Sequence, residues 1–229
     1  MELKQRLEII KERIRRIAVS CNRDPVSIRL VVVSKTFPPE TVKEAIEAGA
    51  AILGENYVQE AREKFEALVH YPVSWHFIGH LQSNKAKYAV RLFDLIHSVD
   101  SLKLARSLDK EAQKAGKIQP ILVQVNISGE DTKSGISAED APALISQISQ
   151  LENLSVKGLM TMPPYFYQPE KVRPYFAALR ELRDQIKKQA PPNVSLEELS
   201  MGMTGDFEVA IKEGATLVRI GTAIFGERK

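Results

Sequence analysis

The feature that most constrains the fold is a regular alternation of short apolar runs and longer amphipathic segments. The apolar runs have the length of strands, and the first of them, Ile28–Lys35, is rich in β-branched residues and ends on a lysine. Between the runs, apolar residues recur at helical spacing. Strands that alternate with helices form a parallel sheet with the helices packed outside it. The sequence therefore predicts an α/β protein.

Eight strands and seven intervening helices can be delimited from this pattern. The expected strands are Ile28–Lys35, Ala51–Glu55, Ser74–Ile78, Leu95–Val99, Ile121–Ile127, Val156–Met160, Leu196–Met201 and Leu217–Ile220. The expected helices are Pro39–Ala48, Val58–Leu68, Asn84–Arg91, Leu102–Ala115, Ala141–Leu151, Lys171–Lys188 and Phe207–Lys212. Before them, an apolar stripe from Leu3 to Ile17 predicts an amphipathic helix within residues 1–20 that packs on the rest.

The number of strands favours a closed (β/α)8 TIM barrel over a doubly wound sheet. About eight strands in a chain of 229 residues fit such a barrel. A doubly wound sheet usually has a glycine-rich turn directly after its first strand. Here that turn is Lys35-Thr36-Phe37-Pro38-Pro39, which contains no glycine. With no linker, low-complexity tract or repeat in the sequence, we expect one barrel domain over residues 1–229.

Charge and cysteine content narrow the class of protein. The 32 basic and 29 acidic residues nearly balance, and no basic stripe indicates nucleic-acid binding. Cys21 is the only cysteine, so no intrachain disulfide can form and a reducing compartment is indicated. Residues 1–20 lack the apolar core of a signal peptide, and no run is long enough to span a membrane. We expect a cytoplasmic protein that does not bind membranes.

Chemically active residues follow the expected strands. In a barrel they would meet at the carboxyl ends of the strands, where barrel active sites lie. The candidates for ligand binding are Lys35, Asn56, His80, Ser200, Met201, Arg219, Gly221 and Thr222. No carboxylate pair suits glycoside hydrolysis and no cluster has metal-ligand spacing, so no metal site is expected.

The combination of these residues points to pyridoxal 5′-phosphate (PLP). A lysine at the end of a buried strand can lose its proton and form a Schiff base. The loops after the seventh and eighth strands of barrels commonly bind phosphate. Here these loops, Ser200–Gly205 and Gly221-Thr222, supply hydroxyl groups and backbone N–H groups. A lysine opposite such loops, with Arg219 between, is the arrangement expected for PLP.

Each residue taken alone also has an ordinary explanation. A single lysine at the end of a strand is more often a solvated surface group, and His80 resembles many loop histidines. Arg219 could instead pair with a carboxylate such as Glu208 or Glu213. The PLP hypothesis depends on all the candidates reaching one rim together.

Several motifs carry a family resemblance along nearly the whole chain. They are Val33-Ser34-Lys35, Gly54-Glu55-Asn56-Tyr57, Trp75 to Lys85, Lys133-Ser134-Gly135, Gly158-Leu159-Met160, Ser200 to Thr204, and Arg219 to Gly226. In this order they closely resemble the pyridoxal phosphate homeostasis protein family. The resemblance implies a barrel similar to the N-terminal domain of alanine racemase, with PLP as a Schiff base on Lys35. It also implies phosphate contacts from Ser200, Gly221 and Thr222, with Asn56 and Arg219 near the ring.

The resemblance further implies a role in cofactor buffering or delivery, with an indirect effect on amino-acid and keto-acid balance. An arginine at the pyridine nitrogen would keep that nitrogen unprotonated, and an unprotonated ring is a poor electron sink. Racemisation also needs a second acid or base, which alanine racemase takes from an additional domain, whereas this sequence ends at Lys229. We therefore expect a non-catalytic monomer whose partners are PLP itself and, transiently, PLP-dependent enzymes.

Two alternatives remain at this point. One is a PLP-dependent amino-acid racemase of weak activity, for which Tyr57, His80 and Tyr165 are the candidate second bases. The other is a barrel that binds some other phosphorylated carbonyl metabolite without pyridoxal.

Overall fold

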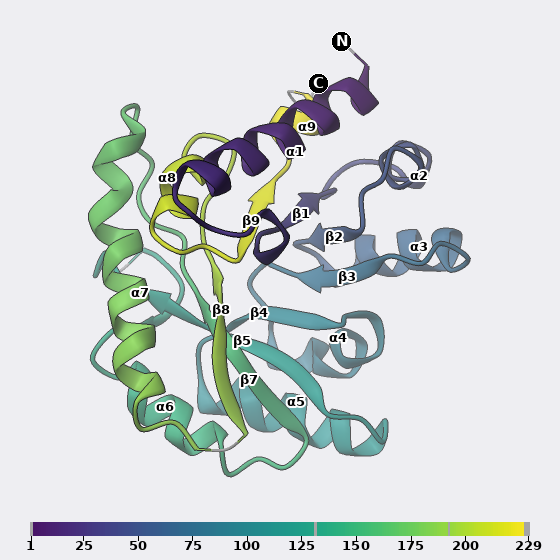
Figure 1. Ribbon diagram of the computed structural model, residues 1–229. Coiled ribbons are helices and arrows are strands. Elements are labelled where there is room, and N and C mark those ends of the chain that lie inside the picture. The colour runs from purple at the N-terminus through teal and green to yellow at the C-terminus, as the bar shows by residue number, and fades with distance from the viewer. Residues whose placement is uncertain (1, 131, 192, 227–229) are drawn as a thin grey trace.

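The computed structural model describes residues 2–130, 132–191 and 193–226, in which helices surround a barrel of strands (Figure 1). The strands are β1 (Arg29–Val33), β2 (Ile52–Glu55), β3 (Ser74–Phe77), β4 (Leu95–Val99), β5 (Gln119–Asn126), β6 (Ile136–Ser137), β7 (Leu154–Met160), β8 (Val194–Ser200) and β9 (Leu217–Ile220). The α-helices are α1 (Leu3–Ser20), α2 (Pro39–Glu47), α3 (Val58–Leu68), α4 (Ala86–Leu92), α5 (Leu102–Lys114), α6 (Ala141–Ile148), α7 (Arg173–Lys187), α8 (Phe207–Lys212) and α9 (Thr222–Phe225). Short 3-10 turns are η1 (Pro25–Ser27), η2 (Ser83–Lys85) and η3 (Pro169–Val172).

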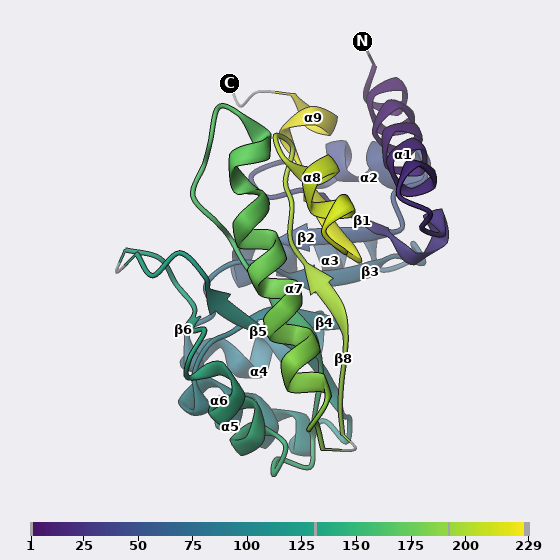
Figure 2. The same cartoon turned by 60° about the vertical axis from the view of Figure 1, so that its left-hand side comes forward.

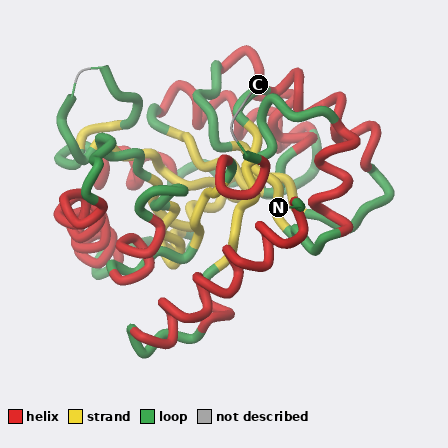
Figure 3. Tube along the Cα trace, turned by 90° about the horizontal axis from the view of Figure 1, so that it is seen from above, coloured by secondary structure: helices red, strands yellow, loops and turns green. Residues whose placement is uncertain are grey.

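The sheet closes on itself, which confirms the expected barrel. The strand order is β4-β3-β2-β1-β9-β8-β7-β5, all neighbours are parallel, and β5 also pairs with β4. A doubly wound sheet would leave β4 and β5 as unpaired edges, so that alternative is excluded. Seen from above, most of the strands lie in the centre, with helices around them (Figure 3).

All eight predicted strands are present, and two short elements besides the 3-10 turns were not predicted. The strand β6, Ile136–Ser137, pairs with the end of β5 beside the ring (Figure 2). The helix α9, Thr222–Phe225, has a single turn. Neither is long enough to show a periodic pattern of apolar residues, which explains why the sequence did not indicate them.

The apolar core has two layers, as the alternation of side chains along a strand requires. The larger layer lies between strands and helices and includes Val32 and Leu53. A small cluster takes one residue from each of six strands, and its members are Val31, Ile52, Leu95, Leu122, Met160 and Leu217. Because these residues alternate with those of the larger layer, they fill the inside of the barrel.

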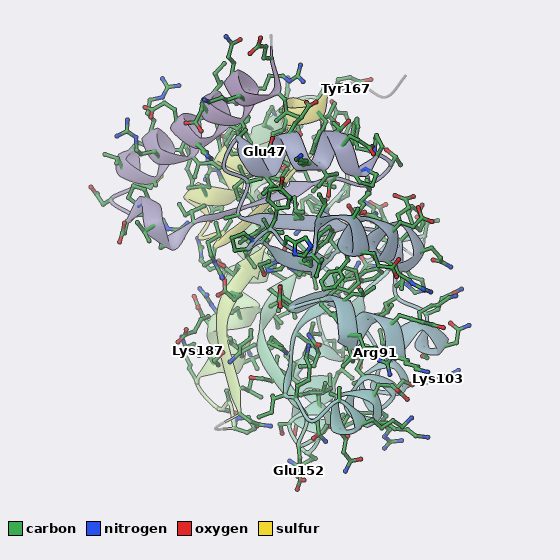
Figure 4. All side chains as sticks on the ribbon, turned by 90° about the vertical axis from the view of Figure 1, so that its right-hand side faces the viewer. Glu47, Arg91, Lys103, Glu152, Tyr167 and Lys187 are labelled. Atoms are coloured by element: carbon green, nitrogen blue, oxygen red, sulfur yellow. The ribbon has the colours of Figure 1, made fainter. Side chains whose placement is uncertain are left out.

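Most charged side chains lie on the outside of the helical layer. In Figure 4, Lys103, Glu152 and Lys187 lie at the edge of the molecule, and Glu47 and Arg91, which are also labelled, are exposed. No helix in the described part of the chain has the length and apolar composition that crossing a membrane requires.

Helix α1 lies against the last two helices of the described residues, α8 and α9 (Figure 1). Its apolar stripe buries Leu7, Ile10 and Ile14. Arg13 pairs with Glu208 on α8 at 2.9 Å. The amphipathic stripe therefore covers the side of the barrel where β9 pairs with β1.

Candidate cofactor site

A cavity of about 280 Å³ opens at the carboxyl ends of the strands. It is lined by Val33, Lys35, Asn56, Ile78, Met162, Tyr165, Phe166, Met203, Thr204, Gly205, Asp206, Arg219, Gly221 and Thr222. A second cavity of about 290 Å³ lies between α1 and the amino ends of β1 and β2. The first cavity is the candidate site, because it collects the predicted chemical groups at the functional end of the barrel.

Lys35 follows β1 on a tight turn. The Phe37 N–H donates to the Ser34 carbonyl at 3.2 Å, and Thr36 has a φ of 70°, in the left-handed region. The Phe37 ring stacks on Phe225 with the ring centroids 4.5 Å apart. This turn ends the strand and presents the lysine at the cavity wall.

Arg219 brings a positive charge into the barrel. The residue is 4% exposed, and its guanidinium donates to Ser200 Oγ at 2.6 Å and to the Thr161 carbonyl at 2.9 Å. Burial lowers the pKa of Arg219 to about 10, against the opposing effect of Asp206. The guanidinium therefore stays charged at neutral pH.

The alternative pairing of Arg219 with Glu208 or Glu213 is wrong. Glu208 pairs with Arg13 on α1, and Glu213 pairs with Arg173 and Arg180 on α7. Those carboxylates hold the outer helices together instead, which leaves the Arg219 charge inside the barrel.

A chain of hydrogen bonds continues from Arg219 through Ser200 to two buried histidines. His97 Nδ1 lies 2.8 Å from Ser200 Oγ, and His97 Nε2 lies 3.0 Å from His76 Nδ1. Because Arg219 has only donors, the Ser200 hydroxyl accepts from it. In the tautomer of neutral His97 that carries its hydrogen on Nε2, the Ser200 hydroxyl donates to His97 Nδ1 and His97 donates to His76. In this tautomer every bond of the chain runs in one direction, away from the cavity.

The pKa values of both histidines agree with this direction. Burial, with help from the charge on Arg29, lowers the pKa of His76 from 6.5 to about 4. Burial also lowers the pKa of His97 well below its usual value, with smaller contributions from His76 and Arg219. Both rings are neutral at neutral pH, so each can accept one hydrogen bond and donate another.

Asn56 offers an unsatisfied acceptor at the same cavity. Its Oδ1 is buried and accepts no hydrogen bond from any described residue. The backbone around it is crowded, because a Cβ on Gly79 would lie 2.2 Å from the Asn56 carbonyl oxygen. A buried acceptor without a donor costs about 1–3 kcal/mol, so the geometry favours a ligand that brings a donor.

The loops after β8 and β9 offer donors for an anion. Within the described ranges, the backbone N–H groups of Gly205, Gly221 and Thr222 donate to no protein acceptor. A Cβ on Gly221 would lie 3.1 Å from the Val33 carbonyl oxygen, so a larger residue would crowd β1. Asp206 accepts a hydrogen bond from the Met203 N–H at 2.6 Å, which stabilises the conformation of the loop after β8.

The structure brings five of the eight predicted residues together and places three elsewhere. Lys35, Asn56, Arg219, Gly221 and Thr222 line one cavity. Ser200 and Met201 are fully buried and do not line it. His80 is exposed and lines two adjoining cavities that share Asn56 with the first.

His97 and Asp206 were not among the predicted site residues. His97 had a usable signal, since it is a histidine in the middle of the otherwise apolar run Leu95–Val99. Asp206 had none, because an aspartate before a helix is an ordinary capping residue. Of the candidate second bases, Tyr165 lines the cavity and Tyr57 does not.

Comparison with known proteins places the chain in a family. Residues 6–229 match the family "Alanine racemase, N-terminal domain". The pyridoxal phosphate homeostasis protein of Aquifex aeolicus is 48% identical over 225 residues, which cover 98% of each chain. This chain belongs to the pyridoxal phosphate homeostasis protein family.

Solved structures of similar proteins agree with that membership. A protein from Bifidobacterium adolescentis described as unknown is 35% identical, with a TM-score of 0.91 over 97% of this chain and 94% of that one. PipY of Synechococcus elongatus, in a structure with PLP bound, is 37% identical, with a TM-score of 0.86 over 98% of this chain and all of that one. The pyridoxal phosphate homeostasis family resemblance seen in the sequence motifs is thus confirmed.

Proposed function

We propose that this protein binds PLP in the cavity at the carboxyl ends of its strands and acts in cytoplasmic PLP homeostasis. One observation carries the proposal: an amine, a buried guanidinium, an orphaned amide oxygen and unpaired backbone N–H groups line a single cavity. PLP has an aldehyde, a ring nitrogen, a phenolic oxygen and a phosphate. The relatives named for PLP homeostasis and the PLP bound in PipY support the same ligand.

The residues take the following roles in this proposal. Bound PLP supplies an aldehyde carbon that reacts with amines and a ring that withdraws electrons from it. Lys35 would provide the amine that bonds to that carbon, and the aldehyde oxygen would leave as water. Gly205, Gly221 and Thr222 direct backbone N–H groups at the phosphate. Asn56 Oδ1 would accept a hydrogen bond from the bound cofactor, and Arg219 would face the ring nitrogen and disfavour its protonation by charge repulsion.

The proposed role is to hold or hand over the cofactor rather than to catalyse a reaction. Efficient racemisation would need a positioned acid or base opposite Lys35. Among the described cavity residues, the candidate is Tyr165, which is 75% exposed on the loop after β7. We therefore propose a monomer that exchanges PLP with solution and, transiently, with PLP-dependent enzymes.

Tyr165 also motivates the second candidate function, a weak amino-acid racemase. Its ring lines the same cavity as Lys35, and the matching family is that of the alanine racemase N-terminal domain. Racemase activity in the wild type that is lost on Tyr165→Phe, at unchanged PLP content, would establish this candidate and contradict a purely binding role.

The first test is the visible absorbance of the protein after incubation with PLP and removal of the unbound cofactor. We expect the wild type to be yellow, with the absorbance band of a lysine Schiff base, and Lys35→Ala to lack that band, because the band requires the covalent bond to the lysine. Lys87→Ala, which removes an exposed lysine on α4, serves as the control and should stay yellow. A wild type that stays colourless would exclude PLP and leave a barrel for another phosphorylated ligand.

A further inference from the structure

A buried ion pair lies directly behind the turn that carries Lys35. Lys64 on α3 is 3% exposed, Glu55 at the end of β2 is fully buried, and Lys64 Nζ lies 2.7 Å from Glu55 Oε1. Lysine and glutamate are rarely buried to this degree, because the free energy needed to remove two charges from water offsets much of the attraction between them. The cavity described above does not include either residue.

The pair holds the residue that precedes Lys35. Lys64 Nζ donates to the Ser34 carbonyl at 2.8 Å, and the Ser34 hydroxyl donates to Glu55 Oε1 at 2.6 Å. Ser34 is therefore fixed through both its backbone and its side chain.

The residue that follows Lys35 is held from the same helix. The Thr36 N–H donates to Glu60 Oε2 at 2.8 Å, and that oxygen lies 3.7 Å from Lys64 Nζ. Thr36 has a φ of 70°, which a β-branched residue adopts only when its surroundings impose it. Both neighbours of Lys35 are thus tied to one cluster, and the lysine is the residue between two fixed points.

The cluster is poorly suited to a purely stabilising role. Glu55 Oε2 is buried and accepts no hydrogen bond from the described residues, so the network is only partly satisfied. Apolar side chains of similar volume often stabilise a fold as well as or better than a buried ion pair. What such side chains could not provide is the charged hydrogen bond to the Ser34 carbonyl.

We propose that Lys64 and Glu55 are positioning residues, which fix the Ser34–Thr36 backbone so that the Lys35 amine meets the aldehyde of PLP. The inference rests on the proposed function for its ligand. It also explains why a second lysine so near the site is not the reactive one: the Lys64 amine is held among Ser34, Glu55 and Glu60 as a charged donor.

The test compares Lys64→Met with a matched control, Lys117→Met. Lys117 also donates to a backbone carbonyl, that of Val90 at 2.8 Å, but lies far from the turn along the chain. The first readout, hydrogen exchange in the protein without PLP, needs no ligand. We expect exchange of the amides of residues 34–37 to become about tenfold or more faster in Lys64→Met and to be unchanged in Lys117→Met.

The second readout separates positioning from binding. Covalent capture of PLP, followed by visible absorbance, should slow by about 10- to 100-fold in Lys64→Met, because small displacements of a reacting group cost that much. The affinity for pyridoxine 5′-phosphate, which has an alcohol in place of the aldehyde, should stay unchanged. Lys64→Arg, which keeps the charge and the donors, should recover part of the capture rate.

The possible results decide between the proposals. Unchanged exchange at residues 34–37, or exchange that rises equally throughout the chain, would overturn the positioning role whatever the ligand is. A wild type that never captures PLP would instead overturn the proposed function, while exchange still decides the role of Lys64. If Lys64→Met does not fold, the double variant Lys64→Met/Glu55→Gln, which buries no unpaired charge, replaces it in every measurement.

Discussion

Arg219 can keep its charge inside the barrel because Ser200 and Thr161 both accept hydrogen bonds from it. Neutral His97 completes the arrangement, because a ring protonated on both nitrogens could not accept a hydrogen bond from Ser200 at Nδ1 and would repel the guanidinium. At the scale of single residues, the two histidines therefore do not act on the ligand themselves. They preserve the direction of hydrogen bonds that fixes Arg219 at the cavity wall.

This arrangement predicts a pH dependence of stability. His76 has a pKa of about 4 in the folded protein against 6.5 ordinarily, so between these values the unfolded chain binds a proton that the folded chain does not. The free energy of unfolding should therefore fall as the pH drops through this window, by on the order of 3 kcal/mol for His76 alone. Urea unfolding at several pH values measures this dependence. The free energy of unfolding of His76→Phe should change less with pH than that of the wild type. The free energy of unfolding of His70→Phe, at an exposed position, should change with pH as that of the wild type does. Equal slopes in all three proteins would contradict the buried neutral histidine.

The loop between β8 and α8 shows how whole elements shape the site. Gly202 has a φ of 92°, and its carbonyl accepts from the Arg219 backbone N–H at 3.0 Å. The loop is thereby tied to β9, and Asp206 closes it onto the start of α8. At the scale of elements, hydrogen bonds join this loop and the buried arginine into one unit.

Gly202→Ala should disturb that unit more than an ordinary turn substitution does. Its Cβ would lie 2.5 Å from the Ala210 Cβ, whereas a Cβ on Gly116, also at positive φ, would meet nothing within 4 Å. Gly116→Ala should cost about 1 kcal/mol from the left-handed backbone alone. Gly202→Ala should cost about 1–3 kcal/mol more, because crowding adds to it. Chemical denaturation measures the free energy of unfolding of both variants. Equal losses of stability would show that a Cβ at residue 202 is not crowded by Ala210 on α8.

At the scale of the whole molecule, much of the site follows from the topology. The closed ring puts β1 between β2 and β9, so Lys35 has Asn56 on one side and Gly221 on the other. The apolar runs predicted all eight barrel strands, and their ends predicted which residues share a rim. Lys35, Asn56 and Arg219 could therefore be predicted as one site from the sequence.

The inside of the barrel could not be predicted in the same way. Ser200 and His97 are 103 residues apart, and their contact depends on strand register and tilt that no sequence pattern specifies. For this reason Ser200, expected at the phosphate, lies instead between Arg219 and His97. The ion pair of Lys64 and Glu55 was not predicted either, because a lysine in a helical segment usually lies on a solvated face, and its partner ends a separate strand.

The measurement that most directly tests PLP binding at Lys35 is covalent mapping. The purified protein is incubated with PLP, reduced with borohydride, digested and analysed by mass spectrometry. We predict one pyridoxyl group per chain, on Lys35. A label on Lys64 or another lysine instead, or no label at all, would contradict the assignment of this cavity as the cofactor site.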